Sequence, residues 1–205
     1  MKEINNLINL AFVLAIFTIA YNFIEGVVSI YFGYQDETLA LFGFGLDSFV
    51  EVFSGFGILN MIILTKNNHN ENNFEKTALR ITAISFYLLS LGLIVTSIIN
   101  IMNGHNPMTT EWGIIISLIS LGIMWWLIYK KKEVGTALKS DAMIADANCN
   151  KVCMQLSVIL LVSSLLYHFF NIGYFDSIGA LIIAFLSFKE GNEAYQKSIN
   201  KKICC

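Results

Sequence analysis

Six long apolar segments dominate the chain and decide what it can fold into. They cover residues 7–33, 38–65, 81–102, 112–130, 142–168 and 171–188. A helix needs about 20 apolar residues to cross the roughly 30 Å hydrocarbon core of a bilayer, and each segment comes close to that length. The stretches between them are mostly polar. The sequence therefore predicts an all-α membrane protein with six transmembrane helices.

The composition agrees with this class and excludes others. Hydrophobic residues make up 56% of the chain and charged residues 14%, against about 45–50% and about 25% in soluble domains. A net charge of −2 offers no basic surface for nucleic acid. The first apolar segment is too long for a signal peptide and lacks a cleavage site, so we expect it to be retained. Because the residues from Lys189 onward are too few to build a core, we expect residues 1–205 to form one transmembrane domain with no cytoplasmic domain.

The basic residues predict how the chain is oriented. All but Lys151 fall on one side of the predicted spans: Lys2, Lys66, Lys76, Arg80, Lys130, Lys131, Lys132, Lys139, Lys189, Lys197, Lys201 and Lys202. The three loops on the other side contain no Lys or Arg. Cytoplasmic loops carry the excess of basic residues, so both termini are expected in the cytoplasm, as suits a prokaryotic inner membrane. For Lys151, inside the fifth segment, we expect a carboxylate partner such as Glu25.

Two pairs of chemically active side chains lie at helical spacing inside the apolar segments. Asp47 and Glu51 are four residues apart, on one face of the second helix. Cys149 and Cys153 have the same spacing in the fifth. Asp47 lies about nine residues in from the outer end and Cys149 about seven from the inner end, so two antiparallel helices would place both pairs at middle depth. Ionisable groups inside a membrane are costly and mark functional sites by default.

Other polar residues continue these faces or form new ones. They are Ser54 in the second segment, Asp146 and Ser157 in the fifth, Asn22, Glu25 and Ser29 in the first, and Asp176 at the start of the sixth.

The four central side chains predict a metal site. Two carboxylates and two thiols suit a tetrahedral, borderline-soft ion, above all zinc and then cadmium. Magnesium requires six oxygen ligands, and manganese also prefers oxygen. Two simpler interpretations stay open. Cysteines on an apolar helix are often only small buried residues, and the acid pair could serve as a proton relay or a packing device.

Four stretches resemble the helices of the cation diffusion facilitator family: "YNFIEGVVSIYFG", "LALFGFGLDSFVEVFSG", "ALKSDAMIADANCNKVCMQLSVILL" and "FDSIGALIIAFLSFKEG". The resemblance implies that Asp47 and Glu51 bind metal, and it places Cys149 and Cys153 where the family has a histidine and an aspartate. Thiols in these positions should shift the preference toward softer metals. Zinc remains the first expectation, with cadmium, mercury or monovalent copper as alternatives.

The resemblance also implies a function. The family exchanges a divalent metal for protons by alternating access, so we expect a transporter rather than an enzyme, with zinc or a softer ion as cargo and no cofactor. Glu25 and Asp146 are expected to pass protons or to position helices. A homodimer is expected to form through small residues of the third segment, namely Ser90, Gly92 and Ser97.

Two other functions remain open. One is a metal-binding or sensory membrane protein that does not transport. The other is a membrane thiol–quinone oxidoreductase, although reactive dithiols usually occur as C-x-x-C and the spacing here is C-x-x-x-C. The terminal Cys204 and Cys205 could collect metal, carry a lipid or form a reduced tail.

Overall fold

The described part of the chain folds into six α-helices, which confirms the predicted fold class. In the computed structural model these are α1 (Lys2–Gln35), α2 (Leu39–Lys66), α3 (Asn72–Asn103), α4 (Glu111–Leu138), α5 (Asp141–Phe170) and α6 (Tyr174–Asn200). The backbone is described for residues 2–66, 72–104, 106–138 and 141–200, and these ranges contain no strand. Within them, side chains are described except at 2–5, 54, 58, 60–62, 64–66, 72–79, 81–82, 141–143, 145–146, 149, 197 and 200.

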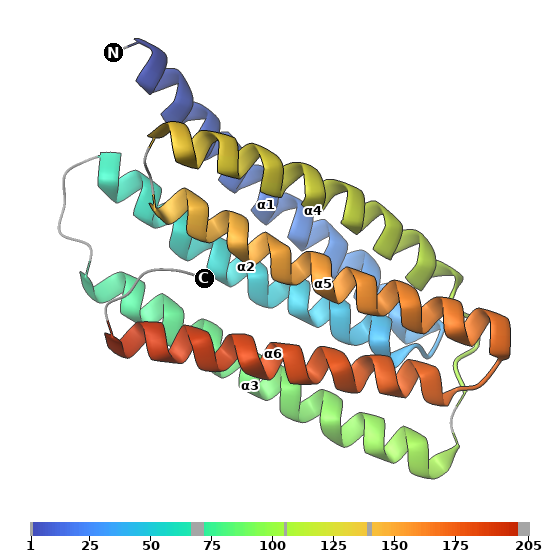
Figure 1. Ribbon diagram of the computed structural model, residues 1–205. Helices are drawn as coiled ribbons and strands as arrows, with labels where there is room; N and C mark the ends of the chain where they lie inside the picture. Colours follow the sequence, from blue (N-terminus) through green and yellow to red (C-terminus); the bar gives the residue numbers. More distant parts are fainter. Residues whose placement is uncertain (1, 67–71, 105, 139–140, 201–205) are drawn as a thin grey trace.

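The helices lie side by side along one common axis (Figure 1). Helix α2 contacts α1, α3, α5 and α6, while α5 contacts α2, α4 and α6. The pair α2 and α5 therefore forms the centre of the bundle, with α1 and α4 on one side and α3 and α6 on the other. Helix α1 begins at the same end of the bundle at which α6 ends. This arrangement places α2, which carries Asp47 and Glu51, directly against α5, which carries Cys149 and Cys153.

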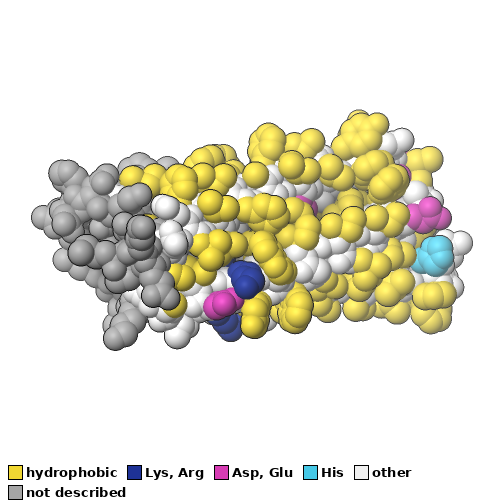
Figure 2. Space-filling model, turned by 90° about the horizontal axis from the view of Figure 1, so that it is seen from above, with side chains coloured by type: hydrophobic (Ala, Val, Ile, Leu, Met, Phe, Trp, Pro, Cys, Tyr) yellow, Lys and Arg dark blue, Asp and Glu magenta, His cyan; other side chains and the backbone are white. Residues whose placement is uncertain are grey.

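Five of the helices contain segments long and apolar enough to cross a membrane: Asn6–Gln35, Leu39–Gly57, Ala83–Asn103, Glu111–Leu138 and Asn150–Phe170. The sixth helix is of similar length and packs along α3 and α5. It is more polar, because Lys189, Glu190 and Glu193 occupy its second half. In the view of Figure 2, hydrophobic side chains cover most of the described bundle and charged side chains occur at only a few places. This surface suits an integral membrane protein.

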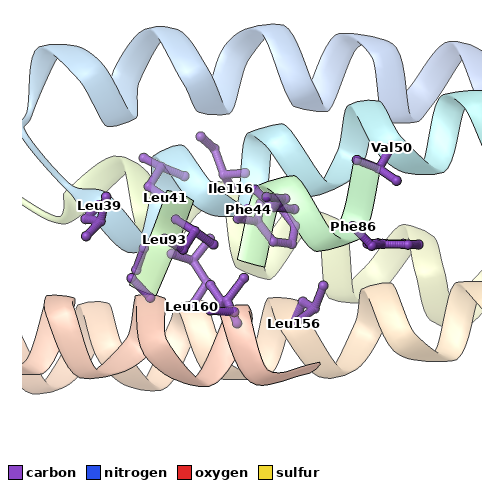
Figure 3. Close-up of a cluster of buried hydrophobic side chains, with 14 residues drawn as sticks. Leu39, Leu41, Phe44, Val50, Phe86, Leu93, Ile116, Leu156 and Leu160 are labelled. Atoms are coloured by element: carbon purple, nitrogen blue, oxygen red, sulfur yellow. The ribbon is translucent and has the colours of Figure 1, made fainter. Parts of the chain in front are cut away.

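A hydrophobic cluster holds the central helices together. Leu41 and Phe44 of α2, Leu160 of α5 and Ile183 of α6 are fully buried in it, and Figure 3 shows the first three packed among side chains of α3 and α4. Helices α1 and α2 approach each other closely at Gly45, where an added Cβ would lie 2.8 Å from the Ile30 backbone nitrogen. The close packing fixes the positions of polar side chains on these helices.

The connection between α5 and α6 is a tight helical hairpin, as the short gap between the predicted segments 142–168 and 171–188 leads one to expect. Helix α5 ends at Phe170 and α6 begins at Tyr174. Asn171 adopts a left-handed conformation (φ 56°), and its N–H donates to the Tyr167 carbonyl at 2.7 Å. This is a usual way to end a helix, and asparagine tolerates the positive φ better than most residues.

The extent of α4 differs from the prediction. The sequence pattern placed the end of the fourth span at residue 130 and the following lysines in a loop, whereas α4 continues to Leu138. Lys132 is exposed on this extension, but Lys131 is fully buried. Assigning all three consecutive lysines to a cytoplasmic loop was therefore wrong for Lys131.

The predicted dimer face on α3 is also not a single face. Ser90 and Ser97 are buried inside the bundle, whereas an added Cβ at Gly92 would meet no described atom within 4 Å. The physical reason is the helical period: residues seven apart lie on the same face, but Gly92 is two residues from Ser90 and points about 200° away. Of the three small residues, only Gly92 is available at the surface for a helix of another chain.

Candidate metal site

The two acids of α2 are fixed by polar side chains from neighbouring helices. Asp47 is buried, and its Oδ1 accepts a hydrogen bond of 2.9 Å from the Ser187 hydroxyl of α6. Glu51 lies one turn further on, and its Oε2 accepts a hydrogen bond of 2.8 Å from the Asn22 amide of α1. Both carboxylates therefore point into the bundle, at the junction of α1, α2 and α6.

Cys153 of α5 packs among apolar side chains of α1 and α4. Its side chain is only 1% exposed and is not in a disulfide. The thiol interacts electrostatically with the Glu51 and Asp47 carboxylates. Two acids and one thiol of the predicted set therefore interact electrostatically, and they lie on the two helices expected to carry them.

The remaining predicted residues of α5 cannot be placed. Cys149 and Asp146 belong to this helix, but their side chains lie outside the described part of the structure, as do Cys204 and Cys205. Among the side chains that are described, no three His, Cys, Asp or Glu residues converge closely enough to hold a metal ion. Metal binding at this junction therefore remains a prediction.

Glu25 of α1 forms the centre of a second polar group beside the first. The Tyr21 hydroxyl donates to its Oε1 at 2.7 Å, and the Ser48 hydroxyl donates to its Oε2 at 3.1 Å. Ser48 follows Asp47 directly in the chain, and the Glu25 charge acts on both Asp47 and Glu51. Two buried carboxyl groups, of Glu25 and Asp47, and the partly buried one of Glu51 thus influence one another within the bundle.

The expected pairing of Lys151 with Glu25 is wrong. Lys151 lies beside Lys132 of α4, while Glu25 is occupied by Tyr21 and Ser48. The reason is again helical geometry, since Lys151 points away from the α5 face that carries Cys153. Buried inside the bundle instead is Lys131, which acts electrostatically on Glu51.

Sequence reasoning missed several residues around the site, among them Ser187, Lys131 and Tyr21, and the sequence carries signals for the first two. Ser187 lies 11 residues after Asp176, which is three helical turns, so it continues the polar face on which Asp176 begins. Lys131 continues a buried stripe of α4 with spacings of three and four residues: Gly113, Ser117, Ser120, Met124, Leu127, Lys131 and Val134. Only Tyr21, an aromatic residue among many, gave no signal of its role.

Comparison with known proteins gives the chain a family. A search of curated proteins finds no match. The family model of the cation efflux transmembrane domain matches residues 11–200, which is nearly the whole chain and covers most of α1 and all of α2 to α6. Members of this family carry metal cations across membranes. With its helical bundle, its apolar surface and its buried acid and thiol side chains, the chain belongs to the cation efflux family, as the resemblance to cation diffusion facilitators predicts.

Proposed function

We propose that the protein exports zinc, or a softer divalent ion such as cadmium, from the cytoplasm in exchange for protons. The ion is bound in the centre of the bundle by Asp47, Glu51, Cys149 and Cys153. The observation that carries this proposal is the packing of α2 against α5, with the Glu51 carboxylate held by Asn22 and the Cys153 thiol buried. It places an oxygen donor and a sulfur donor on the two central helices of a cation-transporting bundle.

The donor set supports the choice of ion. Zinc accepts thiolate and carboxylate ligands in tetrahedral geometry, and cadmium shares its affinity for sulfur. Magnesium and calcium are bound by oxygen alone and with higher coordination numbers. Cys149 precedes Cys153 by four residues of the same helix, so one regular helix offers both sulfur atoms on one face.

Proton exchange follows from the chemistry of the same ligands. A thiol or a carboxylic acid must lose its proton before it binds a metal, so metal binding releases protons and protons displace metal. Glu25, beside the site and bonded to Tyr21 and Ser48, is positioned to pass such protons. Asp146 is the second candidate for this role. The basic residues near both termini favour cytoplasmic termini, and analogy with the cation efflux family then favours export from the cytoplasm.

The test is zinc flux in proteoliposomes that contain the purified full chain and a fluorescent zinc indicator. An imposed pH gradient should drive zinc against protons. Replacement of Cys149 and Cys153 by Ser, or of Asp47 by Asn and Glu51 by Gln, should abolish flux and zinc binding. Matched controls are Cys204 and Cys205 replaced by Ser and Glu133→Gln, an exposed acid of α4; both should transport normally.

Three outcomes would contradict parts of the proposal. Zinc binding that survives the double cysteine variant would remove the thiols from the site. Flux that is indifferent to the pH gradient would argue against proton exchange. Tight zinc binding without flux, in vesicles proven to be sealed, would favour a metal-binding or sensory protein over a transporter.

A further inference from the structure

A groove opens on the side of the bundle between the end of α1, the first half of α2 and the second half of α3. It lies where α1 passes into α2, opposite the end at which α1 begins and α6 ends (Figure 1). Its volume is about 620 Å³, within the range of about 300–1,000 Å³ that ligand sites have. Gly92 of α3 keeps it open, because an added Cβ there would meet no described atom within 4 Å. Leu88 and Thr96 line the groove and are exposed, so it opens onto the surface that faces the membrane.

The wall that α3 contributes changes from apolar to polar along its length. Leu88, Leu89 and Leu93 line the part nearer to the middle of the helix, and Thr96 and Asn100 line the part nearer to its end. From Leu88 to Asn100 this wall is about 18 Å long, at about 1.5 Å per residue. Half of a roughly 30 Å hydrocarbon core is about 15 Å. The wall therefore has the length of one lipid leaflet.

The opposite wall has the same gradient. Phe42 and Leu46 of α2 line the part toward the middle of the bundle, and Gln35 and Glu37 line the part where α1 ends and turns into α2. Both Gln35 and Glu37 are exposed there. The two walls thus place apolar side chains toward the middle of the membrane and polar ones toward its surface, which is the order of an acyl chain and its head group.

The charge at the polar end of the groove favours a cationic head group. The three connections at this end of the bundle, residues 36–38, 104–110 and 171–173, contain Asp36 and Glu37 but no Lys or Arg. An anionic head group would meet acids without a basic residue to bind it, whereas an ammonium group is attracted to them. The charge of this end therefore complements a head group that carries an amine.

The size of the groove favours a lipid chain over a helix of another protein. A helix with its side chains is about 10–12 Å wide, so a helical segment as long as the α3 wall fills more than about twice the volume of the groove. A single acyl chain is narrower and fits within it. Lipid tails are as apolar as the groove, so the gain on binding comes from close contacts that replace a void.

We propose that this groove binds one acyl chain of a phospholipid from the adjacent leaflet, and that it prefers lipids with an ammonium head group to anionic lipids. The acyl chain lies between Leu93 of α3 and Phe42 of α2, and the head group lies beside Glu37. The inference goes beyond metal transport and does not depend on the proposed metal site.

The test is native mass spectrometry of the full chain in detergent micelles, with phosphatidylethanolamine or phosphatidylglycerol added at equal concentration. Gly92→Phe fills the groove. Gly122→Phe of α4 is the matched control, since an added Cβ at Gly122 also meets no described atom within 4 Å and Gly122 does not line the groove. We expect the wild type and Gly122→Phe to retain one phosphatidylethanolamine about fivefold more strongly than phosphatidylglycerol, which is the order of effect of one charge near a membrane surface. Gly92→Phe should retain neither lipid.

A second pair of variants tests the head group. Glu37→Gln should reduce the preference for phosphatidylethanolamine to within about twofold. Glu133→Gln, which removes an exposed acid at the other end of the bundle, should leave the preference unchanged. A wild type that prefers phosphatidylglycerol would overturn the assigned head group.

Three outcomes would overturn the groove as the lipid site. The first is lipid retention by Gly92→Phe equal to that of the wild type, and the second is an equal loss of lipid in Gly122→Phe. The third is a wild type that retains no lipid, is dimeric, and becomes monomeric in Gly92→Phe, because a second copy of the chain would then occupy the groove.

A measurement on the wild type covers the case in which Gly92→Phe does not fold. A phosphatidylethanolamine with a photoreactive group in its acyl chain should crosslink in proteoliposomes chiefly to peptides that contain residues 42–46 and 88–93, on the two walls of the groove. Crosslinks spread evenly over the apolar faces of all helices would show only the surrounding lipid and would overturn the proposal.

Discussion

The Ser187 hydroxyl of α6 donates a 2.9 Å hydrogen bond to the Asp47 carboxylate of α2. The two residues are 140 positions apart in the chain, and both are buried. This bond is therefore a tertiary contact that fixes the direction of one proposed ligand. It links α6, which packs with α3 at one side of the bundle, to the proposed metal site.

We expect Ser187→Ala to destabilise the protein by about 1–3 kcal/mol, because a buried carboxyl group loses its hydrogen-bond donor. Thermal unfolding in detergent measures the loss, and zinc affinity should fall with it because Asp47 is no longer held in place. Ser97→Ala is the matched control, since the Ser97 hydroxyl is equally buried but has no hydrogen-bond partner among the described residues. Equal unfolding temperatures for both variants would show that the Ser187 bond contributes nothing.

Asp176 holds the beginning of α2 in place. Its Oδ2 and Oδ1 accept hydrogen bonds of 2.8 and 3.1 Å from the backbone N–H groups of Leu39 and Ala40. We expect Asp176→Ala to cost about 1–2 kcal/mol, as does the loss of other helix N-terminal caps. Asp176→Asn, which keeps one acceptor oxygen, should cost less. Hydrogen exchange at the amides of Leu39 and Ala40 is the specific measurement, and exchange rates unchanged in Asp176→Ala would contradict the capping role.

Asp36 makes stability depend on pH. It lies between α1 and α2. Burial raises the pKa of its carboxyl group, and repulsion by Glu111 raises it further. Its Oδ2 has no hydrogen-bond partner in the described structure. A raised pKa in the folded state means that folding favours the protonated form. The contribution of Asp36 to stability is thus full below about pH 3.9, its ordinary pKa, and is lost as the pH rises through the folded value.

Asp36→Asn should therefore unfold at a higher temperature than the wild type at pH 7, by a few degrees, since about 1 kcal/mol corresponds to roughly 2–4 °C in a chain of this size. The advantage should shrink on acidification. Glu133→Gln, at an exposed position, provides the control and should show no such trend. If the advantage of Asp36→Asn grew as the pH falls, the pKa of Asp36 would not be raised in the folded state.

Much of the bundle could be predicted from the sequence because apolar length and helical spacing are local properties. The packing of the helix that carries Glu51 against the helix that carries Cys153 follows from the two i, i+4 pairs and from antiparallel central helices. The partners of these residues could not be predicted in the same way. Ser187 and Asn22 reach the acids only because α6 and α1 adjoin α2, and helix adjacency in a bundle is not encoded in any one segment.

Charge patterns were the least reliable guide. Three consecutive lysines at the end of an apolar segment indicate a cytoplasmic boundary, and for Lys130 and Lys132 this holds in the sense that their side chains face outward. Lys131 lies on the opposite side of the helix, where the buried stripe of α4 passes. A boundary rule counts charges along the chain and does not record the helix face on which each one lies. Lys151 was expected to pair with Glu25, but it lies beside Lys132 instead.

Zinc K-edge X-ray absorption of the loaded protein tests the proposed site most directly. The protein used would carry Ser at Cys204 and Cys205, so that Cys149 and Cys153 supply the only thiols. We predict two sulfur atoms at about 2.3 Å from the zinc and oxygen atoms at about 2.0–2.2 Å, with the sulfur signal lost when Cys149 and Cys153 are also replaced by Ser. A spectrum with nitrogen and oxygen neighbours alone would contradict a site shared between the acids of α2 and the thiols of α5.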